Sequence, residues 1–328
     1  MRSAVALFIA MLAGASASAS ETQPLTLEAT IPLGRVTGRI DHLAIDLPRQ
    51  RLFVAELGND SVGVVDLKSG KLLRTMTGLS EPQGLVFVAA TDQLYVANAG
   101  DGSVRAFNGS DLSPAGLIEL GADADNLRVD PMGRYVLAGY GSGAIALLDL
   151  VQHKKIAEIP LRAHPEGFQV SRDGHWAYVN VPDNHEIAVV DLTTRKQIAT
   201  WPTRGLGANF PMSLDESGGG LWVAFRSPPR LTWYDIASST ATVTVETCGD
   251  SDDVFTDSRR HRVYIVCGSG HVEVFQRQAV TYTRVSRVGT REGARTGLYV
   301  PELDRLFVAA RATRTEPATI LVYRPSAP

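Results

Sequence analysis

A pair of alternating apolar runs around a tight turn recurs along this chain, and it restricts the fold more than any other feature. The clearest copy runs from Leu94 to Phe107, where two such runs flank Gly100-Asp101-Gly102. Alternation with a period of two is typical of half-buried strands, and a glycine-rich turn between them is typical of a β-hairpin. The same hairpin returns six more times, so the sequence predicts an all-β fold built from repeats.

The spacing of the repeat identifies the architecture. We mark each copy at the residue six positions before its second strand, and successive marks lie 41 to 44 residues apart. This period matches the four-stranded blade of a β-propeller. The marks are Asp46, Val88, Asp130, Ser171, Asp215, Asp257 and Val300. The prediction is therefore a seven-bladed propeller.

The two ends of the chain are expected to complete the ring together. After the strands at 306–310 and 319–323 the chain stops before a fourth strand of the last blade, whereas a strand at 25–31 precedes the first blade. Pairing the N-terminal strand with the last blade closes the ring and removes two exposed strand edges. Residues 20–328 are thus expected to form a single propeller domain.

The first 19 residues have the pattern of a secretory signal peptide. Met1-Arg2-Ser3 carries one positive charge, an apolar run extends from Ala4 to Ala13, and Ala-x-Ala sites end at Ala17 and Ala19. The apolar run is too short for a permanent membrane anchor. The mature protein is therefore expected to be periplasmic or secreted, without membrane insertion.

The charge balance disfavours nucleic acid and anionic membranes as main partners. The whole chain has 32 basic and 35 acidic residues and a net charge of −3, which gives no general attraction to phosphate. The basic stretch at 259–262 is expected to lie in a turn and to be solvated.

The second strands of the blades contain motifs such as Leu94-Tyr95-Val96-Ala97-Asn98 and Ala177-Tyr178-Val179-Asn180. These motifs resemble those of the YVTN-repeat, YncE-like β-propellers, an exported bacterial family. The resemblance covers essentially all of the mature chain and implies a periplasmic propeller. It implies no particular function, because members of the family include binding proteins, surface proteins and proteins with no assigned role.

Polar side chains gather where the chain leads into the first strand of each blade. In a propeller these loops surround one mouth of the central channel, where ligands tend to bind. Four and five residues before the marks, five carboxylates from four blades are expected to converge on this mouth. The candidate ligand-binding residues are Asp41, His42, Asp125, Asn126, His164, Glu166, Asn209, Asp252, Asp253 and Arg295.

Such a carboxylate cluster is unfavourable unless a cation or another ligand occupies it. The oxygen donors Asp125, Asn126, Glu166 and Asp252 would favour a hard divalent cation, Ca²⁺ or Mg²⁺, over zinc. A transition metal on the mouth histidines His42, His164 and His185 is a second interpretation, although no metal-binding spacing supports it. The alternative to any site is that these side chains only hydrate the channel and cap strands through water.

The chain contains two cysteines, and both are expected at the mouth. Cys248 lies in the loop that leads into the sixth blade, and Cys267 ends the second strand of that blade. Antiparallel pairing brings them together, and an oxidising compartment favours a disulfide between them. This disulfide would hold the loop that carries Asp252 and Asp253.

Two functions remain open at this stage. The first is a non-enzymatic binding or scaffold protein that captures a small polar or cationic ligand, a metal ion or a periplasmic protein. The alternative is a metal-dependent hydrolase or lyase acting on a lactone-like molecule, as in other propellers that hold a divalent ion at the channel mouth. In that case His42 or His164 would act as acid or base and Arg295 would stabilise an oxyanion.

Overall fold

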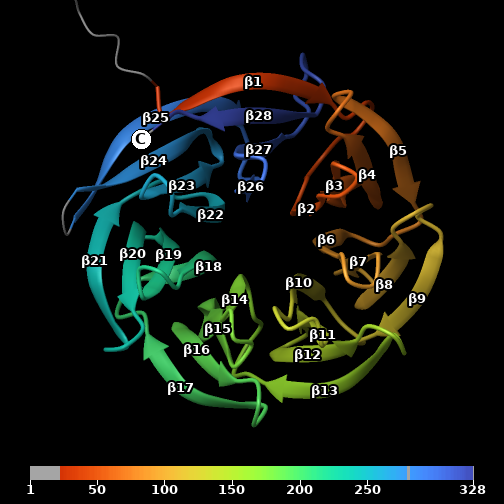
Figure 1. The fold of residues 1–328 in the computed structure, drawn as a ribbon. Helices are drawn as coiled ribbons and strands as arrows, with labels where there is room; N and C mark the ends of the chain where they lie inside the picture. Colours follow the sequence, from red (N-terminus) through yellow and green to blue (C-terminus); the bar gives the residue numbers. More distant parts are fainter. Residues whose placement is uncertain (1–22, 279–280, 328) are drawn as a thin grey trace, which may run out of the picture.

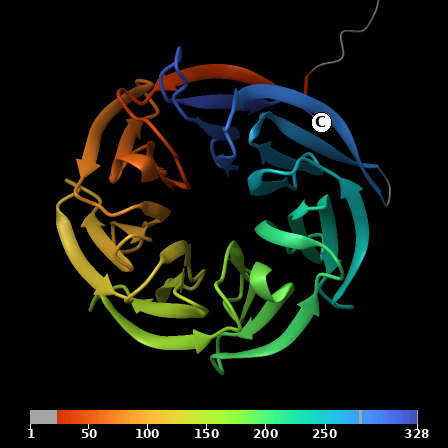
Figure 2. The same cartoon turned by 180° about the vertical axis from the view of Figure 1, so that it is seen from behind.

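The computed structural model describes residues 23–278 and 281–327, and these form a ring of seven four-stranded antiparallel sheets around a central channel (Figure 1). Seen from behind in Figure 2, the chain still runs once around the ring in sequence order. The all-β, seven-bladed prediction is therefore confirmed. The predicted signal peptide, residues 1–19, lies outside the described residues.

In six blades the four strands follow one another along the chain, from the channel to the rim. Blade 1 contains β2 (Leu43–Asp46), β3 (Arg51–Glu56), β4 (Ser61–Asp66) and β5 (Lys71–Thr77), and blade 2 contains β6 (Pro82–Val88), β7 (Gln93–Asn98), β8 (Ser103–Asn108) and β9 (Pro114–Glu119). Blade 3 contains β10 (Ala124–Val129), β11 (Tyr135–Tyr140), β12 (Ala144–Asp149) and β13 (Lys154–Pro160), and blade 4 contains β14 (Phe168–Val170), β15 (Trp176–Val181), β16 (Glu186–Asp191) and β17 (Lys196–Pro202). Blade 5 contains β18 (Gly207–Asp215), β19 (Gly220–Ser227), β20 (Pro229–Asp235) and β21 (Thr240–Glu246), and blade 6 contains β22 (Ser251–Asp257), β23 (Arg262–Cys267), β24 (Ser269–Gln278) and β25 (Thr281–Glu292).

The seventh blade is assembled from both ends of the chain. It contains β26 (Thr296–Val300), β27 (Arg305–Ala310) and β28 (Thr319–Pro325), and its outermost strand is β1 (Leu25–Pro32). β1 pairs antiparallel with β28, with Leu25 opposite Pro325 and Ile31 opposite Ile320. Figure 1 shows the red β1 along the outside of the blue β28. The predicted closure of the ring is therefore confirmed.

The hydrophobic core lies between the blades. The described residues contain seven clusters of buried apolar side chains, and each joins two adjacent blades. Phe53 of blade 1, for example, packs in one cluster with Leu85 and Leu94 of blade 2. Because both faces of each sheet are covered, every residue of β3 is buried, which explains why the second strands are apolar throughout.

The rim strands bend around the outside of the ring. Each blade has a register shift between its two outer strands, such as those between Val64 and Val65 and between Val189 and Val190. A β-bulge at this place bends the strand and increases its twist. The rim strands are correspondingly solvated, with Leu73, Leu117 and Ile198 more than half exposed.

Helical structure in the described part of the chain is limited to two 3-10 turns, η1 (Leu57–Asn59) and η2 (Pro182–Asn184). Each follows the second strand of its blade and ends in a left-handed residue, Asp60 or His185. Within residues 23–278 and 281–327 we find no helix with the length and apolar character needed to cross a membrane.

The expectation of a solvated basic turn at 259–262 is wrong for two of its residues. Arg260 binds the buried carboxylate of Asp257 at 3.0 Å and that of Asp304 in blade 7 at 2.8 Å. Arg262 is 8% exposed and donates to the Ser326 carbonyl oxygen at 3.1 Å. A buried carboxylate needs a cation or hydrogen-bond donors, so these arginines join blades 6 and 7 instead of facing the solvent.

Candidate functional site

The loops that lead into the first strands surround a cavity of about 280 Å³ at one mouth of the channel. Nine of the ten candidate ligand-binding residues contribute to its wall. These are Asp41, His42, Asp125, Asn126, His164, Glu166, Asp252, Asp253 and Arg295. Side chains from blades 1, 3, 4, 6 and 7 therefore meet at one point, as a regular ring requires.

Asn209 is the exception, because it lies outside the wall of the cavity. Its side-chain amide is fully buried and donates to Asn180 Oδ1 at 3.0 Å and to the Glu186 carbonyl oxygen at 3.0 Å. Asn209 therefore links blades 4 and 5. Its position in β18 put it near the mouth, but its side chain is used within the structure.

Four charged residues of the cavity were not among the predicted site residues: Arg39, Asp123, Arg128 and Arg226. Arg39 and Asp123 lie seven residues before their marks, at the position that also supplies His164. Counting back seven residues from each mark, as well as four and five, would have found them. Arg128 lies within the inner strand β10, and Arg226 lies near the end of β19, so only their charge in otherwise apolar strands could have indicated them.

These additions change the charge balance of the mouth. The wall contains six carboxylates, but also four guanidinium groups and two imidazoles. Arg39 pairs with Asp41 at 3.0 Å, Arg226 pairs with Asp252, and Arg295 pairs with the same Asp252 at 2.5 Å. The cavity is therefore a mixed-charge pocket, in contrast to the acidic one predicted.

His42 and Asp41 show how strongly the buried charges interact. His42 Nδ1 lies 3.6 Å from Asp253 Oδ1, and Nε2 lies 3.9 Å from Asp41 Oδ1. Burial alone would lower the pKa of His42, but the carboxylates of Asp253 and Asp41 raise it to about 10. Burial raises the pKa of Asp41 to about 6, against the opposing charges of His42 and Arg39. His42 is thus a cation at neutral pH.

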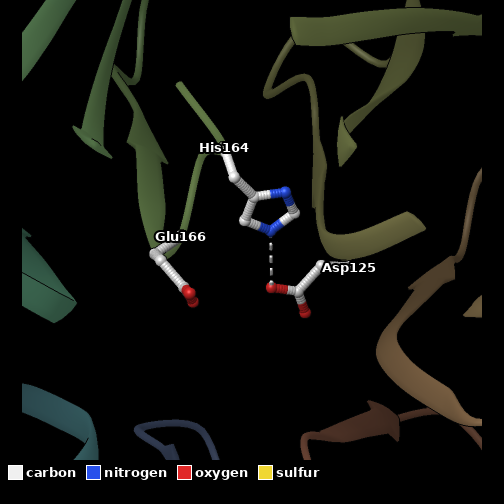
Figure 3. Close-up of side chains that lie close together, drawn as sticks. All are labelled: Asp125, His164 and Glu166. Carbon is white, nitrogen blue, oxygen red and sulfur yellow. Dashed lines mark ion pairs between the residues drawn. The ribbon is translucent and has the colours of Figure 1, made fainter. Parts of the chain in front are cut away.

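Blades 3 and 4 bring together a possible set of metal ligands. One ligand atom each from Asp125, His164 and Glu166 can be chosen so that all three lie within 4.8 Å of one another. His164 Nε2 lies 3.8 Å from Asp125 Oδ2. Figure 3 shows these two groups facing each other, with the Glu166 carboxylate directed to the space beside them.

The backbone fixes the orientation of the His164 ring. Its Nδ1 lies 2.6 Å from the carbonyl oxygen of Gly141, and a carbonyl can only accept, so Nδ1 carries a hydrogen and donates. Nε2 is left to face Asp125. Metal-binding histidines usually have this arrangement, in which one ring nitrogen donates to a carbonyl or carboxylate and the other binds the ion.

Beside His164 lie the half-buried Glu166 and the buried Asn126, and the side-chain oxygen of Asn126 lacks a hydrogen-bond partner among the described residues. Among the described residues, no cation lies within ion-pairing distance of the Glu166 carboxylate; burial, followed by the charge of Asp125, raises its pKa to about 8. Asn126 is 3% exposed and donates to Asp125 at 3.2 Å, but its Oδ1 accepts no hydrogen bond. A buried acceptor without a donor costs about 1–3 kcal/mol, so a bound cation or donor is favoured here.

This grouping differs from the oxygen-only set suggested by the sequence. Asp252 is taken by Arg226 and Arg295, whereas His164 joins Asp125 and Glu166. The set of three histidines is not formed either, because His185 is exposed and outside the cavity wall and His42 is enclosed by carboxylates. His185 is the left-handed residue that follows η2, and this exposed position lies away from the channel.

The predicted disulfide between Cys248 and Cys267 is present, with 5.9 Å between the two Cα atoms. It holds the loop before β22 against the end of β23. In that loop Asp250 accepts from Gly268 N through its carbonyl at 2.6 Å and from Arg295 Nη1 through its carboxylate at 3.1 Å. The crosslink therefore fixes one side of the mouth.

Comparison with known proteins supports the propeller fold but points to no activity. The sequence matches no protein-family model and no curated protein. A chain of the solved structure of Kuenenia stuttgartiensis hydrazine synthase is similar with a TM-score of 0.78 and 16% identity, over 90% of this chain and 96% of that one. A chain from the crystal structure of a mitotic checkpoint complex is similar with a TM-score of 0.79 and 14% identity, over the whole of both chains. Identities this low support the propeller fold alone.

Proposed function

We propose that this protein is a binding protein whose channel mouth holds a divalent cation through Asp125, His164 and Glu166, together with a small polar ligand. The observation that carries the proposal is the approach of these three side chains from two blades. The hydrogen bond from His164 Nδ1 to Gly141 and the unpartnered Asn126 Oδ1 support it. Water in the channel would not by itself require a histidine oriented in this way.

The ligand set favours a metal ion of intermediate character. Carboxylates suit Mg²⁺, Ca²⁺ and Mn²⁺, whereas imidazole suits Zn²⁺ and other transition ions. One imidazole with two carboxylates therefore favours Mn²⁺ or Zn²⁺ over the Ca²⁺ or Mg²⁺ that oxygen donors alone would select. Asn126 Oδ1, beside Asp125, is available either to the ion as a fourth ligand or to a hydroxyl group of the bound molecule.

We further propose that the protein is exported and related to the YVTN-repeat propellers. The N-terminal pattern of residues 1–19 and the disulfide between Cys248 and Cys267 support export. The Tyr-Val-containing second strands support the relationship. Expression with residues 1–19 intact, followed by cell fractionation, should recover a shortened protein outside the cytoplasm; full-length protein inside the cytoplasm would contradict export.

Calorimetric titration of the metal-free protein at pH 8 tests the proposed cation site. We expect Mn²⁺ or Zn²⁺ to bind with a stoichiometry of one, and His164→Gln or Glu166→Gln to weaken binding at least about tenfold, since each removes a ligand. His185→Gln and Glu246→Gln are matched controls, because both wild-type residues lie outside the cavity wall and should leave binding unchanged. Equal binding by all four variants, or no binding, would contradict the site.

Metal-assisted hydrolysis of a lactone-like molecule is a second candidate function. It is favoured by one observation: three protein ligands leave coordination positions open, as in catalytic metal sites. Assays of lactone hydrolysis with the Mn²⁺-loaded and Zn²⁺-loaded protein should then show rates that Glu166→Gln abolishes. Background rates for both proteins would exclude this candidate for the lactones tested.

A further inference from the structure

Below the mouth, the channel is lined by alternate residues of the seven inner strands. The residue two positions before each mark lines a second cavity of about 400 Å³. Six members of this ring are uncharged, and the seventh is Arg128. The ring consists of Ala44, Val86, Arg128, Gln169, Ser213, Phe255 and Leu298. Arg128 is therefore the single charged member of this ring, although His42 and Asp253 also border the second cavity.

Arg128 borders both cavities, so it lies at the floor of the mouth. Its Nη1 donates to the carbonyl oxygen of Leu127 at 2.7 Å, and its guanidinium lies 5.4 Å from the centre of the Phe168 ring. These contacts hold the group but leave most of its five N–H donors without an acceptor. Burial lowers the pKa of Arg128, against the more distant charges of Asp253 and Asp125.

The other three arginines of the mouth differ from Arg128 in this respect. Arg39, Arg226 and Arg295 each pair with a carboxylate. Within the described part of the chain, no carboxylate lies within 4.0 Å of the Arg128 guanidinium. Among the four arginines that the described structure places at the mouth, Arg128 alone lacks a carboxylate partner, and it alone reaches the second cavity.

We propose that Arg128 binds the carboxylate of a small organic acid at the floor of the mouth cavity. A guanidinium presents donors in a fork that matches a carboxylate in a bidentate geometry. A single negative charge is favoured over phosphate, because a phosphate group carries about −1.5 to −2 charges and would be repelled more strongly by the carboxylates of the wall.

The remaining groups of the cavity indicate the rest of the ligand. Here the inference rests on the proposed cation site. A hydroxyl next to the carboxylate could bind the cation and donate to Asn126 Oδ1, which accepts no hydrogen bond from the described residues. A cavity of about 280 Å³ lies just below the range of about 300–1,000 Å³ that is usual for drug-sized ligands, so the ligand is small. The class is a small 2-hydroxycarboxylate.

Titration of glycolate into the Mn²⁺-loaded protein tests this inference, with glycolamide as the uncharged analogue of the same shape. We expect glycolate to bind at least about tenfold more tightly than glycolamide, and Arg128→Gln to remove that preference while Mn²⁺ binding stays within about twofold. Arg128→Lys keeps the charge and should retain part of the preference. Arg74→Gln, at a residue on the rim strand β5, should retain all of it.

Thermal melting of each variant separates loss of binding from loss of folding. If Arg128→Gln does not fold, Arg128→Lys and the glycolate–glycolamide comparison on the wild type still decide the question. Equal affinity for glycolate and glycolamide, tighter binding of inorganic phosphate than of glycolate, or an unchanged preference in Arg128→Gln would overturn the inference. Failure of Mn²⁺ to bind would instead contradict the proposed cation site, and glycolate would then be titrated into the metal-free protein, where dependence on Arg128 remains the criterion.

Discussion

The charge of His42 depends strongly on its neighbours. It lies between two carboxylates, and its side chain is 20% exposed. Its pKa of about 10 in the folded protein compares with about 6.5 for a free histidine. The folded protein therefore holds this proton more tightly than the unfolded chain does, so the interaction stabilises the fold only while His42 is protonated.

The stability of the metal-free protein should consequently fall as the pH rises from about 6.5 to 10. A group with a raised folded pKa contributes its full stabilisation below the unfolded value and loses it as the pH passes the folded value. His164, with a pKa of about 9, and Glu166, with a pKa of about 8, change stability in the same direction. Since one pKa unit corresponds to about 1.4 kcal/mol, we expect a loss of several kcal/mol, measured by denaturant unfolding at pH 6.5, 8 and 9.5 with a chelator.

His42→Gln should unfold with a weaker dependence on pH over this range, because one of the titrating groups is gone. His185→Gln is the control, since His185 is exposed and outside the cavity wall. Stability that rises or stays constant between pH 6.5 and 9.5 would show that the mouth histidines are not held as cations by Asp253 and Asp125.

At the scale of elements, the loop between β21 and β22 depends on its disulfide. Cys248 and Cys267 are 19 residues apart in the sequence, and closing a loop of this size is expected to stabilise the fold by about 3 kcal/mol. The same loop provides Asp250 to Arg295. Loss of the disulfide should therefore affect both the stability of the fold and the order of the mouth.

Replacing both cysteines by serine should lower the free energy of unfolding by about 2–4 kcal/mol. Denaturant unfolding of the double variant and of the reduced wild type measures this effect, and the two should agree. We expect the cation site on blades 3 and 4 to keep its affinity, because its ligands do not contact this loop. Unchanged stability of the double variant would mean that other contacts already hold the loop.

The inner strands show what sequence can and cannot predict about such a site. Because each blade repeats the same geometry, a fixed distance from the mark was sufficient to place Asp41, Asp125 and Glu166 at one mouth. Asn209, next to the counted position Phe210, was expected there as well, but the partners of a side chain depend on its rotamer and its neighbours. Arg226 was missed because it lies in the second strand of its blade, and the count covered only the residues before the marks.

At the scale of the whole molecule, the fold could be predicted because a regular ring needs only a period, four strands per unit and a way to close. The repeat and the strand at the N-terminus supplied all three. Partner choice within the mouth could not be predicted, because Asp252 and His164 are equally polar in the sequence. Only the structure shows that arginines form ion pairs with Asp252, whereas His164 faces Asp125.

The ring also explains why the proposed cation site belongs to no single blade. Asp125 comes from β10 of blade 3, whereas His164 and Glu166 come from the loop before β14 of blade 4. Their approach depends on the cluster of buried side chains that joins these blades, which includes Leu137 and Phe168. The site is therefore a property of the closed ring.

Anomalous diffraction from a crystal grown with Mn²⁺ tests the central claim most directly. The account predicts one strong peak at the channel mouth, within coordination distance of an oxygen of Asp125, an oxygen of Glu166 and Nε2 of His164. A mouth without a peak, or a peak bound by other residues while these three keep their positions, would contradict it.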